Sequence, residues 1–289
     1  MTETQMRPFF EDVRAHYDTL PAFFALFLDP TMTYSSGYFE REDMTLEEAQ
    51  IAKIDMSLRK AGVQPGHRLL EVGFGWGYTM RYAAEQFQAN VVGLTLSEPQ
   101  NNHILAKLAE QPLTAGSIET RVNGWEQFNE PVDSVISLEV FEHFRYERYQ
   151  AFFDRMHAIL PDGGRMLIQT NLRYSWHTLQ KQGIEVSHDD VIFAKFIQKV
   201  IFPGGQLCEP SVVVDHIKRA GFQEPETVSL AEHYIPTLDM WAANLEAHKD
   251  EAIELTSKET YENFLWYLTG CAQRFRTGHI DVYQFACIA

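Results

Sequence analysis

Short apolar runs alternate with helix-like segments through the middle of this chain. The runs typical of buried strands span 68–75, 90–97, 119–125, 133–140 and 165–172. Segments with apolar residues at helical spacing lie between them, at 80–87, 99–111 and 146–160. Such alternation predicts an α/β fold in which a doubly wound, mostly parallel sheet carries helices on both faces.

The alternation stops after the fifth run. Residues 171–210 form a long insertion, in which we expect a helix at 189–202 followed by the turn FPGGQ. Insertions of this length are commonly lids or substrate walls, so this one is predicted to be a helical cap over the substrate site. The remaining pattern is a helix at 211–222, a strand near 226–230, two helices within 236–276 and a final strand at 281–288. We therefore predict one domain over 1–289, with an N-terminal helical segment at 1–60.

The first run leads into LLEVGFGWGY, which puts Gly73, Gly75 and Gly77 between a strand and a helix. Glycines at such a turn let the backbone approach a ligand closely. A dinucleotide fingerprint needs its third glycine one residue later and an acidic residue about 20 residues further on. The next strand ends instead in Thr95 and Leu96. The loop therefore predicts a binding site of another type.

The stretch SLEVFEHF, at 137–144, sets Glu139, Glu142 and His143 among apolar residues. A strand end that leads into a helix, with its polar groups in water or at the helix cap, is the simplest explanation, because Glu is rarely buried without a partner. If the chain is helical after Glu139, the side chains at i+3 and i+4 share its face.

Composition excludes several functions. The formal net charge is -16, and Lys and Arg form no run, which argues against a nucleic-acid partner. The three cysteines are widely spaced without a CxxC, so neither a disulfide framework nor a metal site is predicted. No signal-peptide pattern and no apolar stretch of about 18 residues is visible. We expect a cytoplasmic protein with no integral membrane segment.

Other stretches occur in a characteristic order: HYD at 16–18, the segment 26–55, VVGLTLS at 91–97, GWEQF at 124–128, FEHF at 141–144, IFPGGQL at 201–207 and the segment 267–285. Together with the ExGxGxG spacing that starts at Glu71, they resemble the cyclopropane fatty acid and mycolic acid cyclopropane synthases. The resemblance implies a class I, Rossmann-like methyltransferase fold with a seven-stranded sheet. It also implies S-adenosylmethionine as the cofactor and S-adenosylhomocysteine as its product.

By this resemblance, one set of residues lines the cofactor site. Glycines admit the amino-acid end of the cofactor, Gln100 can hydrogen-bond the ribose, and Trp125 can lie along the adenine. The set is Tyr34, Ser35, Glu71, Gly73, Gly75, Gly77, Thr95, Leu96, Gln100, Trp125, Glu126 and Leu138.

The resemblance also implies a reaction, in which methyl transfer to a carbon-carbon double bond of an acyl chain leaves a carbocation. In the family a bound bicarbonate then acts as the base. It is held by a Cys after YS, the Glu of FEH, a His on the following strand, and a Tyr. Here Ser36 stands at the Cys position and Gln169 at the His position, whereas Glu142 and Tyr234 remain.

Glu139 stands where the family typically has Gly. Since a carboxylate appears where bicarbonate ligands disappear, we hypothesise that Glu139 replaces the bicarbonate as the base. The acceptor is then a lipid or isoprenoid-like alkene, and an acyl carrier protein is a possible partner. The expected catalytic residues are Glu139, Glu142, His143, Tyr234 and Tyr17, with Ser36 and Gln169 at the substrate or anion site.

Two alternatives stay open at this point. Plant alkaloid N-methyltransferases also resemble SxExFEH, and a Glu142–His143 pair could deprotonate a small-molecule amine. A non-catalytic binding or regulatory protein with a methyltransferase fold is the second alternative, suggested by the two lost bicarbonate ligands. Labelling of an acceptor by an isotopic methyl donor distinguishes all three.

Overall fold

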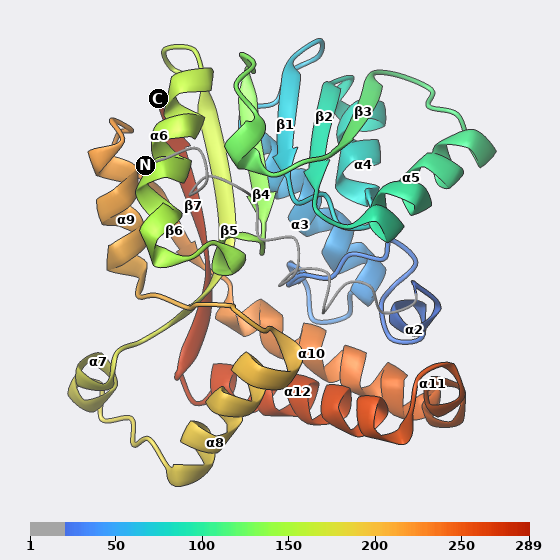
Figure 1. Ribbon diagram of the computed structural model, residues 1–289, viewed down its shortest axis with the longest axis vertical. Coiled ribbons are helices and arrows are strands. Elements are labelled where there is room, and N and C mark those ends of the chain that lie inside the picture. Colours follow the sequence, from blue (N-terminus) through green and yellow to red (C-terminus); the bar gives the residue numbers. More distant parts are fainter. Residues whose placement is uncertain (1–20) are drawn as a thin grey trace.

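The computed structural model describes residues 21–289, and within them it has one seven-stranded sheet (Figure 1). The strand order is β3-β2-β1-β4-β5-β7-β6. All pairs are parallel except those of β7, which runs antiparallel to β5 and β6. This confirms the predicted doubly wound, mostly parallel sheet. The strands are β1 (Arg68–Val72), β2 (Asn90–Thr95), β3 (Ser117–Val122), β4 (Ser134–Leu138), β5 (Arg165–Arg173), β6 (Glu226–Ser229) and β7 (Ile280–Ile288).

Helices cover both faces of the sheet because successive strand residues point to opposite sides. Leu70 packs in one cluster with α6 (Tyr149–Ile159) and α9 (Pro210–Arg219). Leu69 packs in another, with α3 (Leu46–Lys60), α4 (Tyr78–Phe87) and α5 (Glu98–Glu110). Helix α3 begins at a capping box in which Thr45 and Glu48 satisfy each other's backbone N–H groups.

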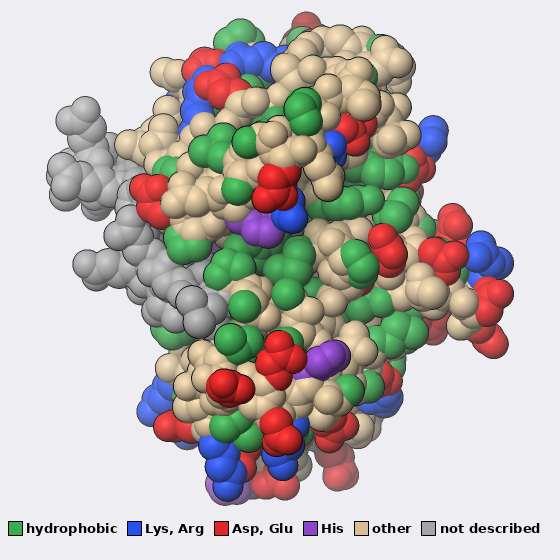
Figure 2. Space-filling view, turned by 90° about the vertical axis from the view of Figure 1, so that its right-hand side faces the viewer, with side chains coloured by type: hydrophobic (Ala, Val, Ile, Leu, Met, Phe, Trp, Pro, Cys, Tyr) green, Lys and Arg blue, Asp and Glu red, His purple; other side chains and the backbone are tan. Residues whose placement is uncertain are grey.

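A third cluster, rich in aromatic residues, lies beyond the carboxyl ends of the parallel strands (Figure 1). It joins short helix α2 (Pro21–Ala25) to α10 (Ala231–Ala247), α11 (Lys249–Leu255) and α12 (Lys258–Arg276). Figure 2 shows hydrophobic side chains across the middle of one face, with charged side chains toward its upper, right-hand and lower margins. None of the helices in the described range is both long enough and apolar enough to span a bilayer.

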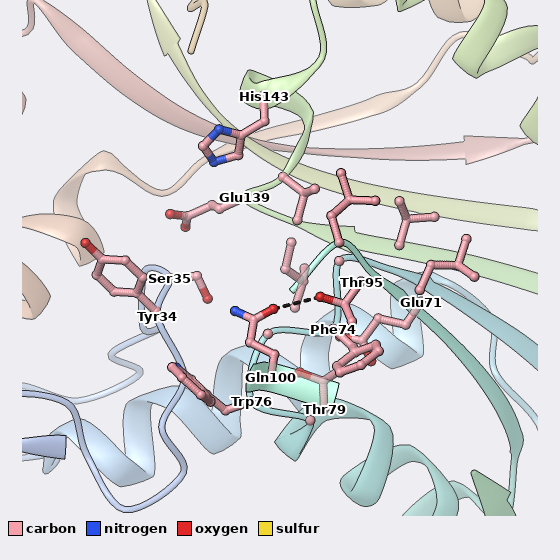
Figure 3. A pocket seen from close by; sticks show the side chains of 18 of the residues that line it. Tyr34, Ser35, Glu71, Phe74, Trp76, Thr79, Thr95, Gln100, Glu139 and His143 are labelled. Carbon is pink, nitrogen blue, oxygen red and sulfur yellow. Dashed lines mark hydrogen bonds between the residues drawn. The ribbon is translucent and has the colours of Figure 1, made fainter. Parts of the chain in front are cut away.

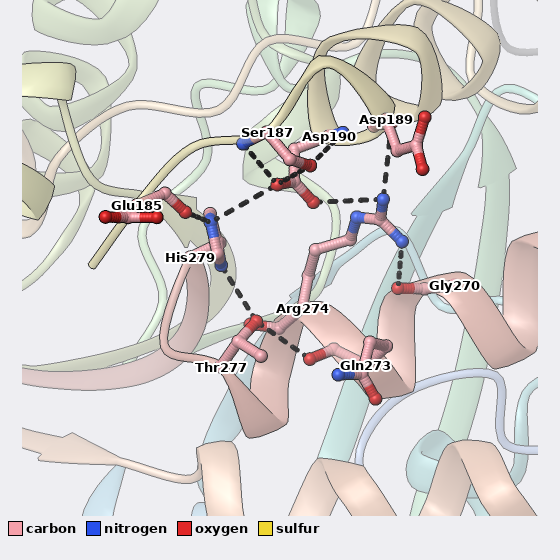
Figure 4. A network of polar contacts seen from close by, with 9 residues as sticks. All are labelled: Glu185, Ser187, Asp189, Asp190, Gly270, Gln273, Arg274, Thr277 and His279. Atoms are coloured by element: carbon pink, nitrogen blue, oxygen red, sulfur yellow. Dashed lines mark hydrogen bonds and ion pairs between the residues drawn. The ribbon is translucent and has the colours of Figure 1, made fainter.

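The segment between β5 and α9 contains α7 (Trp176–Lys181), α8 (His188–Phe196) and the π-helical turn η5 (Ile197–Ile201). Helix α8 is anchored to α12 by polar contacts (Figure 4). The Arg274 guanidinium lies 3.0 Å from Asp190 and 3.9 Å from the ring centroid of Phe193. The His279 ring makes a further contact with the cap, because its Nε2 atom lies 3.1 Å from the carbonyl oxygen of Glu185, just before α8. An ion pair and a cation–ring contact, both made by Arg274, therefore attach the cap to helix α12.

Several predicted boundaries are wrong. The cap begins later than residue 171, because β5 continues to Arg173 as the partner of β7. The predicted helix at 189–202 is an α-helix that passes into a π-helical turn at Ile197. Three helices, not two, occupy the C-terminal region. The first begins at Ala231, so Pro236 lies inside it.

Candidate active site

A cavity opens at the carboxyl ends of β1, β2 and β4, on the side of the aromatic helical cluster (Figure 3). The strand order reverses between β1 and β4, and α/β proteins bind ligands at this switch point. The cavity measures about 1160 Å³ with its open mouth included. Every residue predicted for the cofactor site lines it, from Tyr34 and Ser35 to Leu138 at the end of β4.

The glycine loop forms one wall of the cavity for two steric reasons. Gly73 has φ +80°, and a Cβ atom there would lie 2.3 Å from a methyl carbon of Val140. Gly75 has φ +54°, and a Cβ atom built on it meets nothing within 4 Å. Gly73 thus allows the glycine loop to pack against the segment that contains Val140. Gly75 leaves space for a ligand close to the backbone.

Polar and aromatic groups face the cavity from β2, from the start of α5 and from the segment after β3. The Thr95 hydroxyl donates to Gln100 Oε1 at 2.8 Å, and Figure 3 shows the amide nitrogen of Gln100 pointing into the cavity. The buried Trp125 ring packs edge-on against Phe152, with centroids 5.3 Å apart. These contacts fix one hydrogen-bonding group and one flat ring before any ligand binds.

Glu126 is held by a partner that the sequence did not indicate. Arg148 Nη1 donates to Glu126 Oε1 at 2.6 Å, and both side chains are about 95% buried. Burial raises the pKa of Glu126, and the charge of Arg148 opposes that rise. Because buried charges in proteins are usually paired, this arrangement keeps an acidic residue at the cavity without an uncompensated charge.

A fully buried lysine, Lys53 of α3, lies behind Ser35 and donates to its hydroxyl at 2.7 Å. Burial lowers the pKa of Lys53 to about 8 and raises the pKa of Glu71 to about 8. Glu71 Oε2 has no hydrogen-bond partner among the described residues. An unpaired buried acceptor at a cavity wall suits a ligand that brings N–H or O–H donors.

The Glu139 carboxylate accepts four hydrogen bonds from the protein. Oε1 accepts from the Ser36 backbone N–H and from Gln169 Nε2, each at 2.8 Å. Oε2 accepts from the Tyr234 hydroxyl at 2.7 Å and from Asn171 Nδ2 at 3.0 Å. These donors come from the N-terminal loop, from β5 and from α10. The side chain is 8% exposed and lines the cavity.

Glu142 lies beside Glu139 and shares one of its partners. Asn171 Nδ2 donates to Glu142 Oε1 at 2.8 Å, and the Thr170 hydroxyl donates to Oε2 at 2.9 Å. Burial, and then the neighbouring Glu139 carboxylate, raise the pKa of Glu142 to about 7. Asn171 therefore bridges the two acidic residues, a role that sequence analysis missed.

The expected helical turn after Glu139 is absent. Glu139 has φ +55°, in the left-handed region, and Phe141–His143 form a 3-10 turn instead of an α-helix. Because only this three-residue 3-10 turn follows Glu139, the α-helical face shared by positions i+3 and i+4 does not form. The two carboxylates meet through Asn171 instead, while His143 lines the cavity separately.

The other predicted residues have mixed outcomes. The Ser36 hydroxyl donates to the Gly37 carbonyl oxygen, so Ser36 contacts Glu139 through its backbone alone. The buried Tyr234 contacts Glu139 as described above, and burial raises its pKa well above the ordinary value. Tyr17 lies outside the described residues. Trp76, which was not predicted, also lines the cavity. No cluster of His, Cys, Asp or Glu within residues 21–289 could hold a metal ion.

The sheet order, the glycine loop at the switch point and the cavity at the carboxyl edge define a class I methyltransferase. The chain belongs to the mycolic acid cyclopropane synthetase family, whose model matches residues 4–285. Members of this family are S-adenosylmethionine-dependent enzymes, and the glycine wall, Gln100 and the unpaired Glu71 oxygen fit that cofactor.

Two relatives from Mycobacterium tuberculosis H37Rv illustrate the similarity. The chain is 50% identical to cyclopropane mycolic acid synthase 1 over 288 residues, covering 98% of each chain. It is 48% identical to the S-adenosylmethionine-dependent methyltransferase UmaA over 282 residues, again covering 98% of each.

Solved structures agree with the sequence comparisons. The mycolic acid cyclopropane synthase CmaA1 complexed with SAH and CTAB has a TM-score of 0.95 at 49% identity, over 99% of this chain and 100% of that chain. Coclaurine N-methyltransferase has a TM-score of 0.75 at 19% identity, over 94% of this chain and 79% of that chain. The second likeness concerns the fold alone.

Proposed function

We propose that this enzyme transfers a methyl group to an alkene carbon of a lipid or isoprenoid-like acceptor, and that Glu139 is the base that ends the reaction. One observation carries the proposal. The Glu139 carboxylate is bound by Ser36, Gln169 and Tyr234, three of the positions that the family resemblance assigns to the bicarbonate site. A tethered carboxylate can therefore do there what a diffusible anion does elsewhere.

Cofactor binding is proposed for the predicted residues that line the cavity. Gln100 Nε2 can donate to a ribose hydroxyl, and the Trp125 ring supplies an apolar face for the adenine. Gly73 and Gly75 admit the amino-acid end, whose ammonium can be bound by the unpaired oxygen of Glu71.

When bound, S-adenosylmethionine would supply an electrophilic methyl group, whose S–CH3 bond breaks with the electron pair left on the sulfur of S-adenosylhomocysteine. The π electron pair of the alkene forms the new C–C bond, which leaves a cation on the other alkene carbon. Glu139 then accepts a proton. If that proton leaves the new methyl group, its bonding electron pair closes a cyclopropane ring. If it leaves a neighbouring carbon, the pair forms a new double bond. In either case the positive charge is removed and the proton is held on the carboxylate.

The other residues around the base have positioning and electrostatic roles. Tyr234, Gln169 and Asn171 hold the carboxylate in one orientation, which is the condition for selective proton removal. Glu142 adds a second acidic group behind Asn171. Aromatic rings that pack toward this region, among them Tyr34 and Tyr267, can exclude water and stabilise a cation.

A labelled methyl donor tests the proposal. The enzyme is incubated with methyl-deuterated S-adenosylmethionine, unsaturated fatty acids and phospholipids, isoprenoid alkenes, and a panel of amines. We expect label in an alkene-derived product, detected by mass spectrometry. A cyclopropane keeps two of the three deuterium atoms, and a methylated alkene keeps all three. Label confined to an amine would contradict the proposal and favour N-methylation.

The form in which the acceptor arrives is a separate part of the proposal. We propose a lipid acceptor, because the relatives act in mycolic acid synthesis. Delivery by an acyl carrier protein and a cytoplasmic location both stay predictions. Comparing turnover of free, phospholipid-bound and carrier-bound acyl chains identifies the form that is used.

A further inference from the structure

A series of side-chain hydrogen bonds connects Glu139 to Lys60, a lysine near the end of α3. Lys60 Nζ donates to Gln284 Oε1 at 3.1 Å, and Gln284 Nε2 donates to Gln169 Oε1 at 3.0 Å. Gln169 Nε2 then donates to Glu139 Oε1 at 2.8 Å. The same Gln284 nitrogen donates to Ser57 Oγ at 3.0 Å. Gln169 and Gln284 are fully or almost fully buried.

Apart from Glu139, which directly follows β4, these residues lie on regular secondary structure. Gln169 and Gln284 are directly paired across the antiparallel strands β5 and β7. Ser57 and Lys60 are three residues apart on α3, so they share the helix face that packs against this part of the sheet. The chain of hydrogen bonds is therefore built on rigid elements, which favours a fixed geometry.

The donor-to-acceptor direction of these hydrogen bonds is set by the groups at the two ends of the series. The Lys60 ammonium can only donate, so the oxygen of Gln284 must face it. That leaves the Gln284 nitrogen for Ser57 and Gln169, and hence the Gln169 nitrogen for Glu139. Ser57 supports the same direction, because its hydroxyl hydrogen is used on the Lys53 carbonyl oxygen and it can only accept from Gln284. Each amide is thus oriented by its neighbour.

We propose that Lys60 and Gln284 are positioning residues for catalysis, which orient Gln169 so that its N–H group holds the Glu139 carboxylate in the position of a base. Neither residue lines the cavity. If Lys60 loses its ammonium, Gln284 can rotate, and Gln169 can then present its oxygen to Glu139. The Gln169 amide oxygen would repel the Glu139 carboxylate, which would then leave the position in which it accepts the proton. This inference rests on the proposed function of Glu139.

Two substitutions test the direction of the hydrogen bonds that run from Lys60 to Glu139. Gln284→Glu keeps the shape and still accepts from Lys60, but it cannot donate to Gln169, which then rotates to donate to it. Lys60→Met keeps the apolar stem and removes the donor. For each we expect kcat to fall about tenfold, the effect of one misdirected hydrogen bond in an active site. We expect unchanged affinity for S-adenosylhomocysteine and a larger share of side products, because the base is displaced.

Controls separate positioning from folding. Arg59→Met makes the same charge change at the adjacent, exposed position, where Arg59 pairs with Asp55, and should leave kcat and product ratio unchanged. Lys60→Arg keeps a donor and should restore most of the turnover. In a Glu139→Gln background, Gln284→Glu should have no further effect on product ratio or residual turnover.

The outcomes distinguish this inference from the function on which it rests. If Glu139→Gln retains full turnover, Glu139 is not the base and the proposed function fails. If Glu139→Gln is inactive but Gln284→Glu and Lys60→Met behave like Arg59→Met, the positioning role alone is overturned. A loss of kcat that follows a matching loss of thermal stability or of cofactor affinity would also overturn it.

Discussion

Glu139 combines a left-handed backbone with a buried carboxylate. A residue with a side chain pays about 1–2 kcal/mol for φ +55°, whereas glycine adopts it freely. Glycine, the residue that the family resemblance predicts at this position in related sequences, would adopt this backbone without that cost. The cost is offset here by the four hydrogen bonds that the carboxylate accepts. A strained residue held by several partners is typical of a functional site.

The pKa of Glu142 gives a pH-dependent prediction of stability. Its folded-state pKa of about 7 is raised above the ordinary 4.5, so between these values the folded protein holds a proton that the unfolded chain has released. The contribution of Glu142 to the free energy of unfolding therefore falls as the pH rises through this window. Glu142→Gln removes that dependence. Denaturation at about pH 5 and about pH 8 should show the variant gaining stability relative to the parent at the higher pH.

Burial shifts the pKa of Lys53 and of Glu71 to about 8, and Glu142 is not among the groups that perturb them, so their contribution is expected to cancel between the two proteins. A stability difference that stays constant between the two pH values would contradict the assignment.

At the residue scale the sequence predicted the cavity lining and three of the four residues that donate to Glu139, but it missed Asn171 and Lys53. Motif positions identified the glycines, Gln100 and Trp125, because these residues follow strand ends in a fixed order. Asn171 and Lys53 gave no motif signal. Their roles depend on how β5 and α3 pack behind the cavity, which a single sequence does not reveal.

The elements themselves were largely predictable because their apolar periods are clear. All seven strands in the described residues fall where apolar runs or β-type residues indicated them. The errors occur where local signals compete with packing. The first C-terminal helix was predicted to lie within 236–276, but α10 begins at Ala231, and Tyr234 in its first turns is buried in the aromatic cluster.

The contact between α8 and α12 gives a prediction for the cap. Arg274→Met removes the ion pair with Asp190 and the cation above Phe193. We expect faster hydrogen exchange in α8 and a several-fold higher KM for the acceptor, with little change in cofactor affinity, since the cavity residues are untouched. Arg276→Met, which removes a more exposed pair with Asp239, is the matched control. Equal effects of the two variants would show that the α8 anchor has no special role.

At the scale of the whole molecule, the cavity lies between the carboxyl edge of the sheet and the aromatic helical cluster. A ligand bound there contacts both, so it should stabilise the complete fold by mass action. S-adenosylhomocysteine is expected to raise the melting temperature in a concentration-dependent manner.

Gly75→Ala should remove most of this rise, because the added methyl group enters space that the ligand needs and is strained at φ +54°. The control is Gly183→Ala, also at positive φ with nothing within 4 Å of the added atom but away from the cavity lining. Equal ligand-induced shifts in both variants would argue against a ligand beside Gly75.

The turnover of Glu139→Gly in the absence and presence of bicarbonate tests whether the Glu139 carboxylate is the base. Glycine relieves the left-handed backbone and vacates the space that the carboxylate occupies, so the variant should fold and bind the cofactor. We predict almost no alkene methylation in bicarbonate-free buffer and partial recovery as bicarbonate is added, with no recovery for Glu139→Gln, whose side chain still fills the space. Full turnover of Glu139→Gly without bicarbonate would contradict the claim that the Glu139 carboxylate is the base.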